Sequence, residues 1–232
     1  MNHEFATTDP PRLRVTIPSG RVEIETAEAA AAVVEVEDGQ DLRVEQRGRE
    51  IVVEPEKRFG RRGDAYVRIQ CPHGTDADLQ VASAELRAVG RFGEVRVRSA
   101  SGDVELGSVA GRLDLTTASG EVEIRSATGG GSIRTASGDI VIGEVAERLS
   151  VMTASGDLTI DAIGQGALDL KSASGDMQIG ITKGSRLRVD ARSLSGDTSS
   201  EVELLGVETA TDGPLVDLKA ASMSGDIRVV RA

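Results

Sequence analysis

Eight acidic residues recur along the chain at nearly regular intervals, and they are the side chains best suited to bind a cation. They are Glu85, Asp103, Glu121, Asp139, Asp157, Asp176, Asp197 and Asp226. If they stack about 4.8 Å apart, neighbouring charges repel by roughly 0.9 kcal/mol in water, so each carboxylate needs a backbone N–H group or a cation as partner. A calcium ion requires several oxygen ligands, whereas the spacing supplies about one carboxylate per turn. The pattern therefore favours a ladder of turn residues over a specific calcium site.

Seven hydroxyl residues form a second row. They are Ser99, Thr117, Thr135, Thr153, Ser172, Ser193 and Ser222. Their spacing puts them in phase with apolar residues such as Leu115 and Val151, so we expect them to point inward and to satisfy backbone groups. They cannot form a set of nucleophiles, because no base accompanies them.

The chain has two histidines and one cysteine. Cys71 and His73 could begin a metal site, but no second pair of ligands exists, and a turn is the better interpretation. Cys71 also lacks a partner that would make it a nucleophile. The tripeptide Arg62-Gly63-Asp64 matches a cell-attachment sequence, which we interpret as chance. The sequence therefore predicts no catalytic residue, no metal site and no cofactor.

Each of these acidic residues except Glu85 closes a Ser-Gly-Asp or Ser-Gly-Glu tripeptide. Glycine can supply a corner with positive φ that a Cβ atom would oppose, and Ser and Asp side chains bond nearby backbone groups. We therefore interpret the tripeptides as a structural turn ladder. Its members are Ser101, Gly102, Asp103, Ser119, Gly120, Glu121, Ser137, Gly138, Asp139, Ser155, Gly156, Asp157, Ser174, Gly175, Asp176, Ser195, Gly196, Asp197, Ser224, Gly225 and Asp226.

The serines of the tripeptides are 18, 18, 18, 19, 21 and 29 residues apart, and apolar and polar residues alternate on both sides of each. Alternation indicates strands with one buried face. An antiparallel meander accepts such a unit, and so does a solenoid in which equivalent strands stack in parallel. Because every position of the unit repeats, the sequence favours an all-β, single-stranded β-solenoid with coils of about 18 residues. A right-handed path is expected, although a left-handed helix of three six-residue sides stays open.

The first 75 residues contain strand-like segments without the regular unit. We expect residues 1–75 to form an irregular, β-rich N-terminal cap, and residues 76–232 to form the solenoid repeats of one continuous domain. Lys57–Asp64 is expected to be an exposed loop. The 29-residue spacing before Ser224 predicts an insertion with a turn at Thr211–Pro214.

Composition limits the partners. The net charge of −11 disfavours binding to nucleic acid or to an anionic membrane. No apolar run is long enough to span a membrane, and the first residues lack the apolar region of a secretory signal. The single cysteine is compatible with a reducing compartment. We therefore expect a cytoplasmic protein.

The series of Thr-Ala-Ser-Gly-Asp units and the closing sequence MSGDIRVVRA resemble a bacterial family of β-strand-repeat proteins. The family is a domain of unknown function, often labelled "putative adhesin". The resemblance extends from Leu13 to Ala232 and implies a β-solenoid-like domain without an established catalytic site.

The sequence therefore predicts a non-catalytic structural or protein-interaction module, a rigid scaffold of unknown partner. The alternative is an adhesin-like surface domain or a cation-binding repeat. An enzyme on a β-helix, such as a polysaccharide lyase, is disfavoured because such sites usually stack sugars on aromatic residues, and the four aromatic residues here all lie in or near the N-terminal cap. They are Phe5, Phe59, Tyr66 and Phe92. The final unit, Ser224–Ala232, ends as a complete strand. It predicts either self-association through the C-terminal coil or coverage of that coil by the loop around Gly206–Pro214.

Overall fold

The computed structural model describes residues 1–37, 42–56, 63–201 and 213–232 of the chain. These residues form twenty β-strands and no α-helix, so the described part contains no helical segment that could cross a membrane. The strands belong to two compact units, Met1–Gly120 and Glu121–Ala232, which we call unit 1 and unit 2. The all-β class expected from the alternating residues is confirmed.

Nine strands are described in unit 1. They are β1 (Asn2–Ala6), β2 (Arg12–Ala27), β3 (Ala31–Glu37), β4 (Leu42–Arg47), β5 (Glu50–Pro55), β6 (Ala65–Pro72), β7 (Thr75–Arg98), β8 (Val104–Val109) and β9 (Leu113–Thr117). The long strand β2 bends at Ser19-Gly20 and illustrates one coil. Leu13 and Val15 are fully buried before the bend, and Val22 is fully buried after it. We call the segment before such a corner the lead-in strand and the segment after it the lead-out strand.

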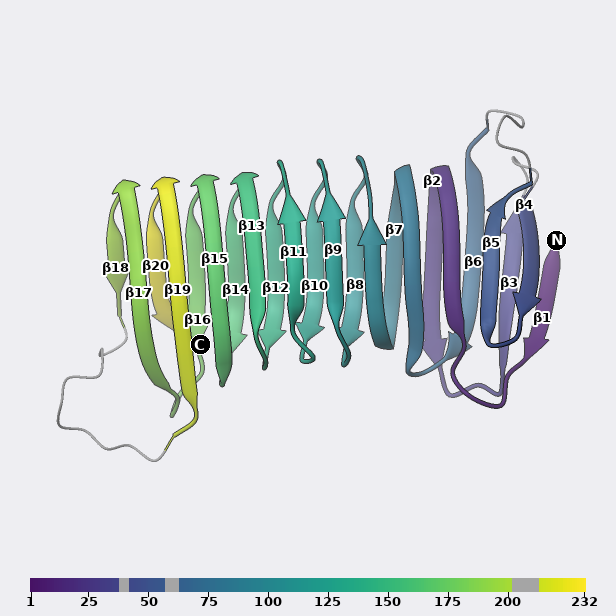
Figure 1. Ribbon diagram of the computed structural model, residues 1–232, viewed down its shortest axis with the longest axis horizontal. Coiled ribbons are helices and arrows are strands. Elements are labelled where there is room, and N and C mark those ends of the chain that lie inside the picture. The colour runs from purple at the N-terminus through teal and green to yellow at the C-terminus, as the bar shows by residue number, and fades with distance from the viewer. Residues whose placement is uncertain (38–41, 57–62, 202–212) are drawn as a thin grey trace. The chain divides into compact units, whose positions relative to one another are not determined.

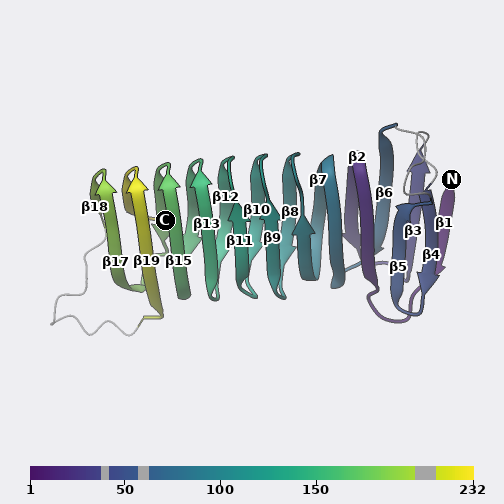
Figure 2. The same ribbon diagram turned by 45° about the horizontal axis from the view of Figure 1, so that its top comes forward.

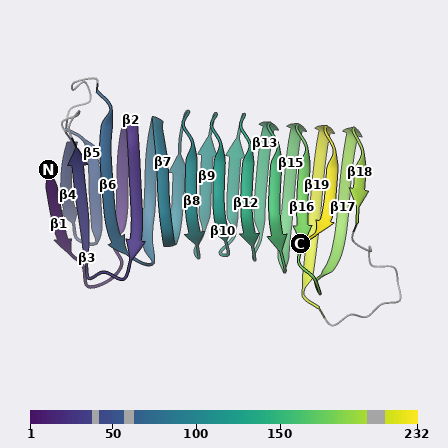
Figure 3. The same cartoon turned by 180° about the vertical axis from the view of Figure 1, so that it is seen from behind.

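Strand β2 comes early in the sequence but lies between strands that come later. In its lead-in half, Arg12 is in register with Glu50 of β5 on one side and with Asp76 of β7 on the other. Its lead-out half pairs with β6 and with β7, again in parallel. Figures 1 and 3 both show β2 between β6 and β7. Residues 1–75 therefore supply one coil of the solenoid in addition to irregular strands, and the expected boundary at residue 75 falls where β7 begins.

Antiparallel strands end unit 1. β3 is antiparallel to β6, β1 is antiparallel to β3, and β4 is antiparallel to β5. The reversal of strand direction interrupts the parallel stacking, so these strands cannot continue the coil pattern. They complete the described end of unit 1 with β4 on the lead-in side and β1 on the lead-out side.

Eleven strands are described in unit 2. They are β10 (Val122–Ala127), β11 (Gly131–Thr135), β12 (Ile140–Val145), β13 (Leu149–Ser155), β14 (Leu158–Ile163), β15 (Gly166–Ser174), β16 (Met177–Ile181), β17 (Arg186–Ser195), β18 (Thr198–Ser200), β19 (Leu215–Ser224) and β20 (Ile227–Arg231). They stack in parallel and in register, so that Val122, Ile140, Leu158 and Met177 lie one above the other. The solenoid expectation is confirmed.

The hand of unit 2 can be followed in Figure 1. The lead-in strands β11, β13 and β15 run upward in the foreground, the lead-out strands β12 and β14 run downward behind them, and successive coils advance to the left. This path is right-handed, the hand that parallel crossovers favour.

The last coil in the sequence is not the last coil in space. β19 pairs with β15 on one side and with β17 on the other, and β20 pairs likewise with β16 and β18. Figures 1 and 2 show β19 between β15 and β17. The expectation that the C-terminal coil forms the open end is therefore wrong. That end is formed by β17 and β18, because the chain leaves one coil's space after β16 and fills it with its final residues.

The core is a thin layer of aliphatic side chains. Valine, isoleucine and leucine dominate the buried positions, and Phe92 is the single buried aromatic residue among the described ones. In the outermost coil of unit 2, Thr198 and Ser200 occupy the positions that Ile227 and Val229 fill in the neighbouring coil. The lead-out positions of the outermost coil thus hold small hydroxyl side chains, whereas its lead-in strand β17 still buries Leu187.

Candidate functional site

A row of five alternating charges crosses the lead-out face of unit 1, and we call it the Arg–Glu ladder. Each member is in register with the next, and all point outward because their chain neighbours, such as Ile24 and Ile69, are buried. In spatial order the members are Glu35 of β3, Arg68 of β6, Glu23 of β2, Arg87 of β7 and Glu105 of β8.

Two pairs of the ladder are close ion pairs. Arg68 donates from Nε and Nη2 to Oε2 of Glu23 over 3.2 and 3.1 Å, and Arg87 Nη1 lies 2.9 Å from Glu105 Oε2. The hydrogen bond to Glu23 raises the pKa of Arg68 above its ordinary value. Both pairs are partly exposed, so their main effect is to fix which strands lie side by side.

Arg21 lies beside the ladder on β2. Its Nε donates to Glu85 Oε2 over 2.9 Å, and this bond raises the pKa of the guanidinium. The same guanidinium lies 5.6 Å from the ring centre of Tyr66, which is the distance of a cation–π contact. Tyr66 is the only tyrosine of the chain, and 42% of its surface is exposed.

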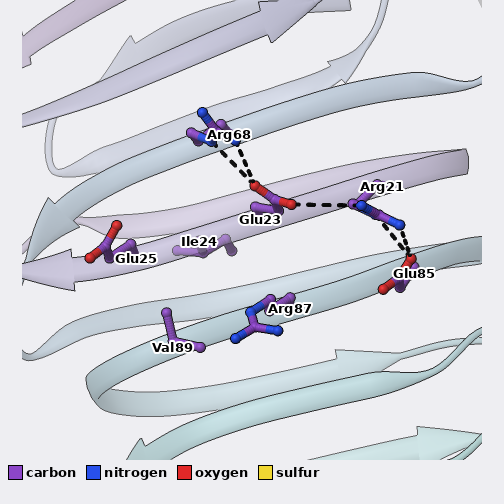
Figure 4. A pocket seen from close by; sticks show the side chains of 8 residues that line it. All are labelled: Arg21, Glu23, Ile24, Glu25, Arg68, Glu85, Arg87 and Val89. Carbon is purple, nitrogen blue, oxygen red and sulfur yellow. Dashed lines mark hydrogen bonds and ion pairs between the residues drawn. The ribbon is translucent and has the colours of Figure 1, made fainter.

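A hollow of about 300 Å³ opens on this face. Figure 4 shows Arg68 and Arg21 directed towards Glu23 from opposite sides, with Arg21 also reaching Glu85. Small-molecule sites are mostly apolar and enclosed, whereas this hollow is shallow and lined by paired charges. It therefore suits contact with another surface better than capture of a small ligand. Its lining residues are Arg21, Glu23, Ile24, Glu25, Arg68, Glu85, Arg87 and Val89.

The predicted turn ladder lies at the corners between lead-in and lead-out strands. In unit 2 the carboxylate of Asp139 accepts the backbone N–H of Asp157 over 2.9 Å, and that of Asp157 accepts the N–H of Asp176 over 2.8 Å. Asp176 then accepts from Asp226, and Asp226 from Asp197, each over 2.8 Å. In space Asp226 lies between Asp176 and Asp197, because the last coil in the sequence is inserted between the two coils that precede it. The four accepting carboxylates thus each have the backbone partner that a stacked row of acids requires.

The motif glycines have the conformation expected of them. All seven have positive φ, including Gly138 at 111° and Gly156 at 109°. A Cβ atom on Gly156 would overlap the carbonyl oxygen of Gly138 in the coil below, so both the dihedral angle and the close approach require glycine. The corner geometry expected from the sequence is confirmed, while the purely structural role of the whole ladder stays a prediction.

The comparisons with known proteins agree with this repeat architecture. The family model described as Toastrack DUF4097 matches residues 14–230. The chain belongs to the Toastrack DUF4097 family. The family resemblance noted in the repeats is thereby confirmed. A search of curated proteins finds no match.

Solved structures resemble the Toastrack chain over nearly its whole length. A structure named putative adhesin from Parabacteroides distasonis is 14% identical, covers 98% of this chain and 96% of its own, and has a TM-score of 0.55. A second putative adhesin, from Parabacteroides merdae, is 14% identical with coverages of 99% and 95% and a TM-score of 0.48. A putative lipid binding protein from Parabacteroides distasonis is 12% identical, with coverages of 98% and 96% and a TM-score of 0.37. At these identities the likeness shows the fold alone.

The predicted row of inward hydroxyls is present in the Toastrack coils, but its members differ. Thr117, Thr135 and Thr153 are buried, and each donates to the carbonyl oxygen of the motif serine over 2.8 to 2.9 Å. The buried Oγ atoms of Ser172 and Ser222 have no hydrogen-bond partner among the described residues. Ser193, by contrast, donates its Oγ to Gly225 O over 2.9 Å, so the serines of the row are satisfied at some corners and not at others.

Cys71 and His73 do not come together as a metal site. Cys71 is buried, and burial raises the pKa of its thiol to about 11, so the thiol is neutral near pH 7. His73 Nδ1 instead lies 2.9 Å from Thr26 Oγ1. Among the described residues no group of three or more His, Cys, Asp or Glu is placed to hold a metal ion. Arg62 and the turn at Thr211-Asp212 lie outside the described residues.

Sequence reasoning missed the Arg–Glu ladder and Tyr66. Arg68 and Glu23 are 45 residues apart, and Arg21 and Glu85 are 64 apart, so no local pattern joins them. The available signal was the outward alternation of charge in Arg21-Val22-Glu23-Ile24-Glu25. It indicates a charged face without revealing which strands flank it.

Proposed function

We propose that this Toastrack chain is a non-catalytic protein-interaction module whose binding surface is the lead-out face of unit 1. The observation that carries the proposal is the exposed Tyr66 with Arg21 against its ring, beside Arg68 and the shallow hollow. Tyrosine and arginine are enriched in the parts of protein interfaces that dominate affinity. A protein surface with acidic groups and an apolar contact for Tyr66 fits this chemistry.

Rigidity supports the same proposal. The side chains on this face are held by cross-strand ion pairs, for example Arg68 to Glu23 and Arg21 to Glu85. A surface that is already ordered loses little conformational entropy on binding. The strands beneath are stacked on a continuous buried layer, so the face presents its charges at fixed separations.

Affinity capture with mass spectrometry from the native host tests this function. Wild-type protein, Tyr66→Ala and Met152→Ala serve as baits, the last as a control because Met152 is an exposed apolar residue of unit 2. A partner that wild type and Met152→Ala retain and that Tyr66→Ala loses supports the proposal. The same partners on all three baits would place binding elsewhere.

A cation-binding repeat is the second candidate, because four carboxylates of unit 2 lie in one row at the corners. In each carboxylate one oxygen accepts a hydrogen bond from a backbone N–H group. Too few oxygens then remain for tight calcium coordination. We expect calorimetric titration with calcium to give no dissociation constant tighter than about 1 mM. A micromolar constant with a fixed stoichiometry would favour this candidate instead.

We also propose that the chain works in the cytoplasm, which the buried, single cysteine permits. The adhesin-like alternative requires the cell surface. Fractionation of host cells, together with labelling of intact cells by an antibody against the chain, distinguishes the two. Surface labelling would favour the adhesin-like alternative.

A further inference from the structure

Among the described residues, one edge of β17, the outermost strand of unit 2, has no neighbouring strand. Among the described residues it pairs with β19 only, and Arg186 donates its backbone N–H to Pro214 O on that side over 2.9 Å. Because N–H groups alternate in direction along a strand, those of Leu187, Val189 and Ala191 face away from β19. Such a row of backbone groups can accept a further strand.

At the residue before the motif serine, the same end carries larger apolar side chains than the other coils do. The residue before the motif serine is alanine in the five preceding coils but Met223 in β19 and Leu194 in β17. The flanking serines of these two residues are in register, so they are neighbours, and they are 63% and 83% exposed. Exposed apolar side chains grouped at a free strand edge indicate an interaction site. The corresponding alanines are Ala100, Ala118, Ala136, Ala154 and Ala173.

We propose that β17 pairs with β17 of a second copy of the chain, antiparallel about a two-fold axis at Ala191. On the outward face this register sets Asp190 opposite Arg192 of the second copy, and Arg192 opposite Asp190. It sets Arg188 opposite Leu194, whose side chain can pack on the aliphatic part of the arginine. The charges of this strand are thus complementary to themselves when the strand is reversed.

Other registers place like charges opposite each other. An axis at Asp190 would bring Asp190 against its own copy and Arg188 against Arg192. An axis at Val189 would set Arg188 opposite Asp190 but would also bring Arg186 against Arg192. In the register centred on Ala191 the charged residues form non-hydrogen-bonded pairs, in which side chains approach most closely.

A second copy fits this edge because a two-fold axis uses the same patch twice. The axis also brings the two β18 strands together, and their small residues, Thr198 to Ser200, permit a close approach. This proposal goes beyond the function above, because it concerns unit 2 and does not use Tyr66. Each can fail without the other.

Sedimentation velocity with charge variants tests the pairing. We expect the wild type to form a dimer. Arg192→Glu places acids opposite acids, and Asp190→Arg places bases opposite bases, so each variant alone should associate at least about tenfold more weakly. An equimolar mixture of the two variants restores both opposite-charge pairs and should dimerise. Arg148→Glu, an outward charge on another part of unit 2, is the control and should leave association unchanged.

Two further measurements keep the test decisive. Ala191→Pro removes an edge N–H that faces away from β19, so the monomer should fold, as judged by circular dichroism, while dimerisation is lost. It replaces Asp190→Arg if that variant fails to fold, since the new arginine would lie beside Lys219. A monomeric wild type at about 100 μM, variants that dimerise like wild type, or a mixture of folded variants that stays monomeric would each overturn the proposal.

Discussion

β2 of unit 1 and β19–β20 of unit 2 both lie between coils that follow one another in the sequence, but their neighbours hold them differently. Glu23 of β2 is in register with Arg68 and Arg87, and Lys219 of β19 is in register with Asp169 and Asp190. Stacking in sequence order would place arginine beside arginine, or aspartate beside aspartate. Like charges on adjacent strands are unfavourable, so the inserted strand separates charges that would otherwise repel.

The two insertions differ in how far this arrangement is realised. One carboxylate oxygen of Glu23 accepts two hydrogen bonds from Arg68, whereas no ion pair of Lys219 is present among the described residues. Beyond the inserted coil, unit 1 continues into antiparallel strands, while the described part of unit 2 has a single further coil, formed by β17 and β18. The comparison indicates that opposite charges in register on adjacent strands favour one strand order even where the ion pairs add little stability. The strands that lie beyond the inserted coil are a separate feature, because they differ between the two units.

The largest expected effect comes from removing the inserted coil of unit 2. Deletion of residues 215–232 takes away Val216, Leu218, Ile227 and Val229, all buried, at about 1.5–3 kcal/mol each. The deletion also removes β19 and β20, the strands with which β17 and β18 pair. We expect hydrogen exchange to show loss of protection throughout β15–β18. Deletion of residues 1–6, which removes only the outer strand β1, is the control and should change protection locally. Unchanged protection of β17 in the first variant would contradict the insertion.

The corners of the two inserted coils should be similarly intolerant of substitution. A Cβ atom on Gly20 would overlap the backbone of Ala65, and one on Gly225 would overlap that of Gly175. Both glycines have positive φ. We expect Gly20→Ala and Gly225→Ala each to cost roughly 2–4 kcal/mol in urea denaturation. Gly48→Ala, at a positive φ with open space around it, should cost about 1 kcal/mol. Equal costs at all three positions would mean that close packing does not matter.

Charge reversal sharpens the comparison between the ends. Glu23→Lys places three basic residues side by side and should lower the thermal midpoint of unit 1 by roughly 3–6 °C. Lys219→Glu places three acids side by side and should lower that of unit 2 by less, because no ion pair is lost. Both shifts should shrink in high salt. Glu25→Lys is the control, because Glu25 is in register with Gln70 and Val89. A shift of equal size there would show that net charge, and not register, is responsible.

The smallest expected effect is a gain in stability. Ser172→Thr and Ser222→Thr should allow the buried hydroxyl to donate as Thr153 does, stabilising unit 2 by about 0.5–1 kcal/mol each. Thr153→Ser is the reciprocal control and should destabilise by a similar amount. A loss of stability in both threonine variants would indicate that the buried space is too small for the added methyl group.

Much of the fold follows from the sequence because each coil repeats the same local chemistry. The alternation around each tripeptide predicts the strands, and the 18-residue spacing predicts the parallel stacking that Val122, Ile140 and Leu158 display. The order of the coils did not follow. A repeat carries nearly the same buried residues wherever it stands, so the core pattern cannot tell a terminal coil from an inserted one. The 29-residue gap before Ser224 predicts an insertion, whereas in the structure the chain builds β17 and β18 one coil away from β16 and then returns to fill the space between.

The candidate site was predictable only in part. The turn corners were predictable, because the glycine conformation and the hydrogen bonds of the neighbouring serine and aspartate depend on a few consecutive residues. The cluster around Tyr66 was not, because its members come from β2, β6 and β7 and meet only through the out-of-order stacking. Opposite charges in register, such as Arg12 between Glu50 and Asp76, are the signal to look for in other chains with this repeat.

The inserted C-terminal coil also bears on protein synthesis. β17 and β18 leave the ribosome before β19 and β20, yet they rest on them. The outermost coil therefore cannot reach its final place until β19 and β20 have also been synthesised. Until then the sides of β15 and β16 that β19 and β20 later cover lack those partners. During synthesis, a β19–β20 segment of a neighbouring nascent chain is able to pair there instead.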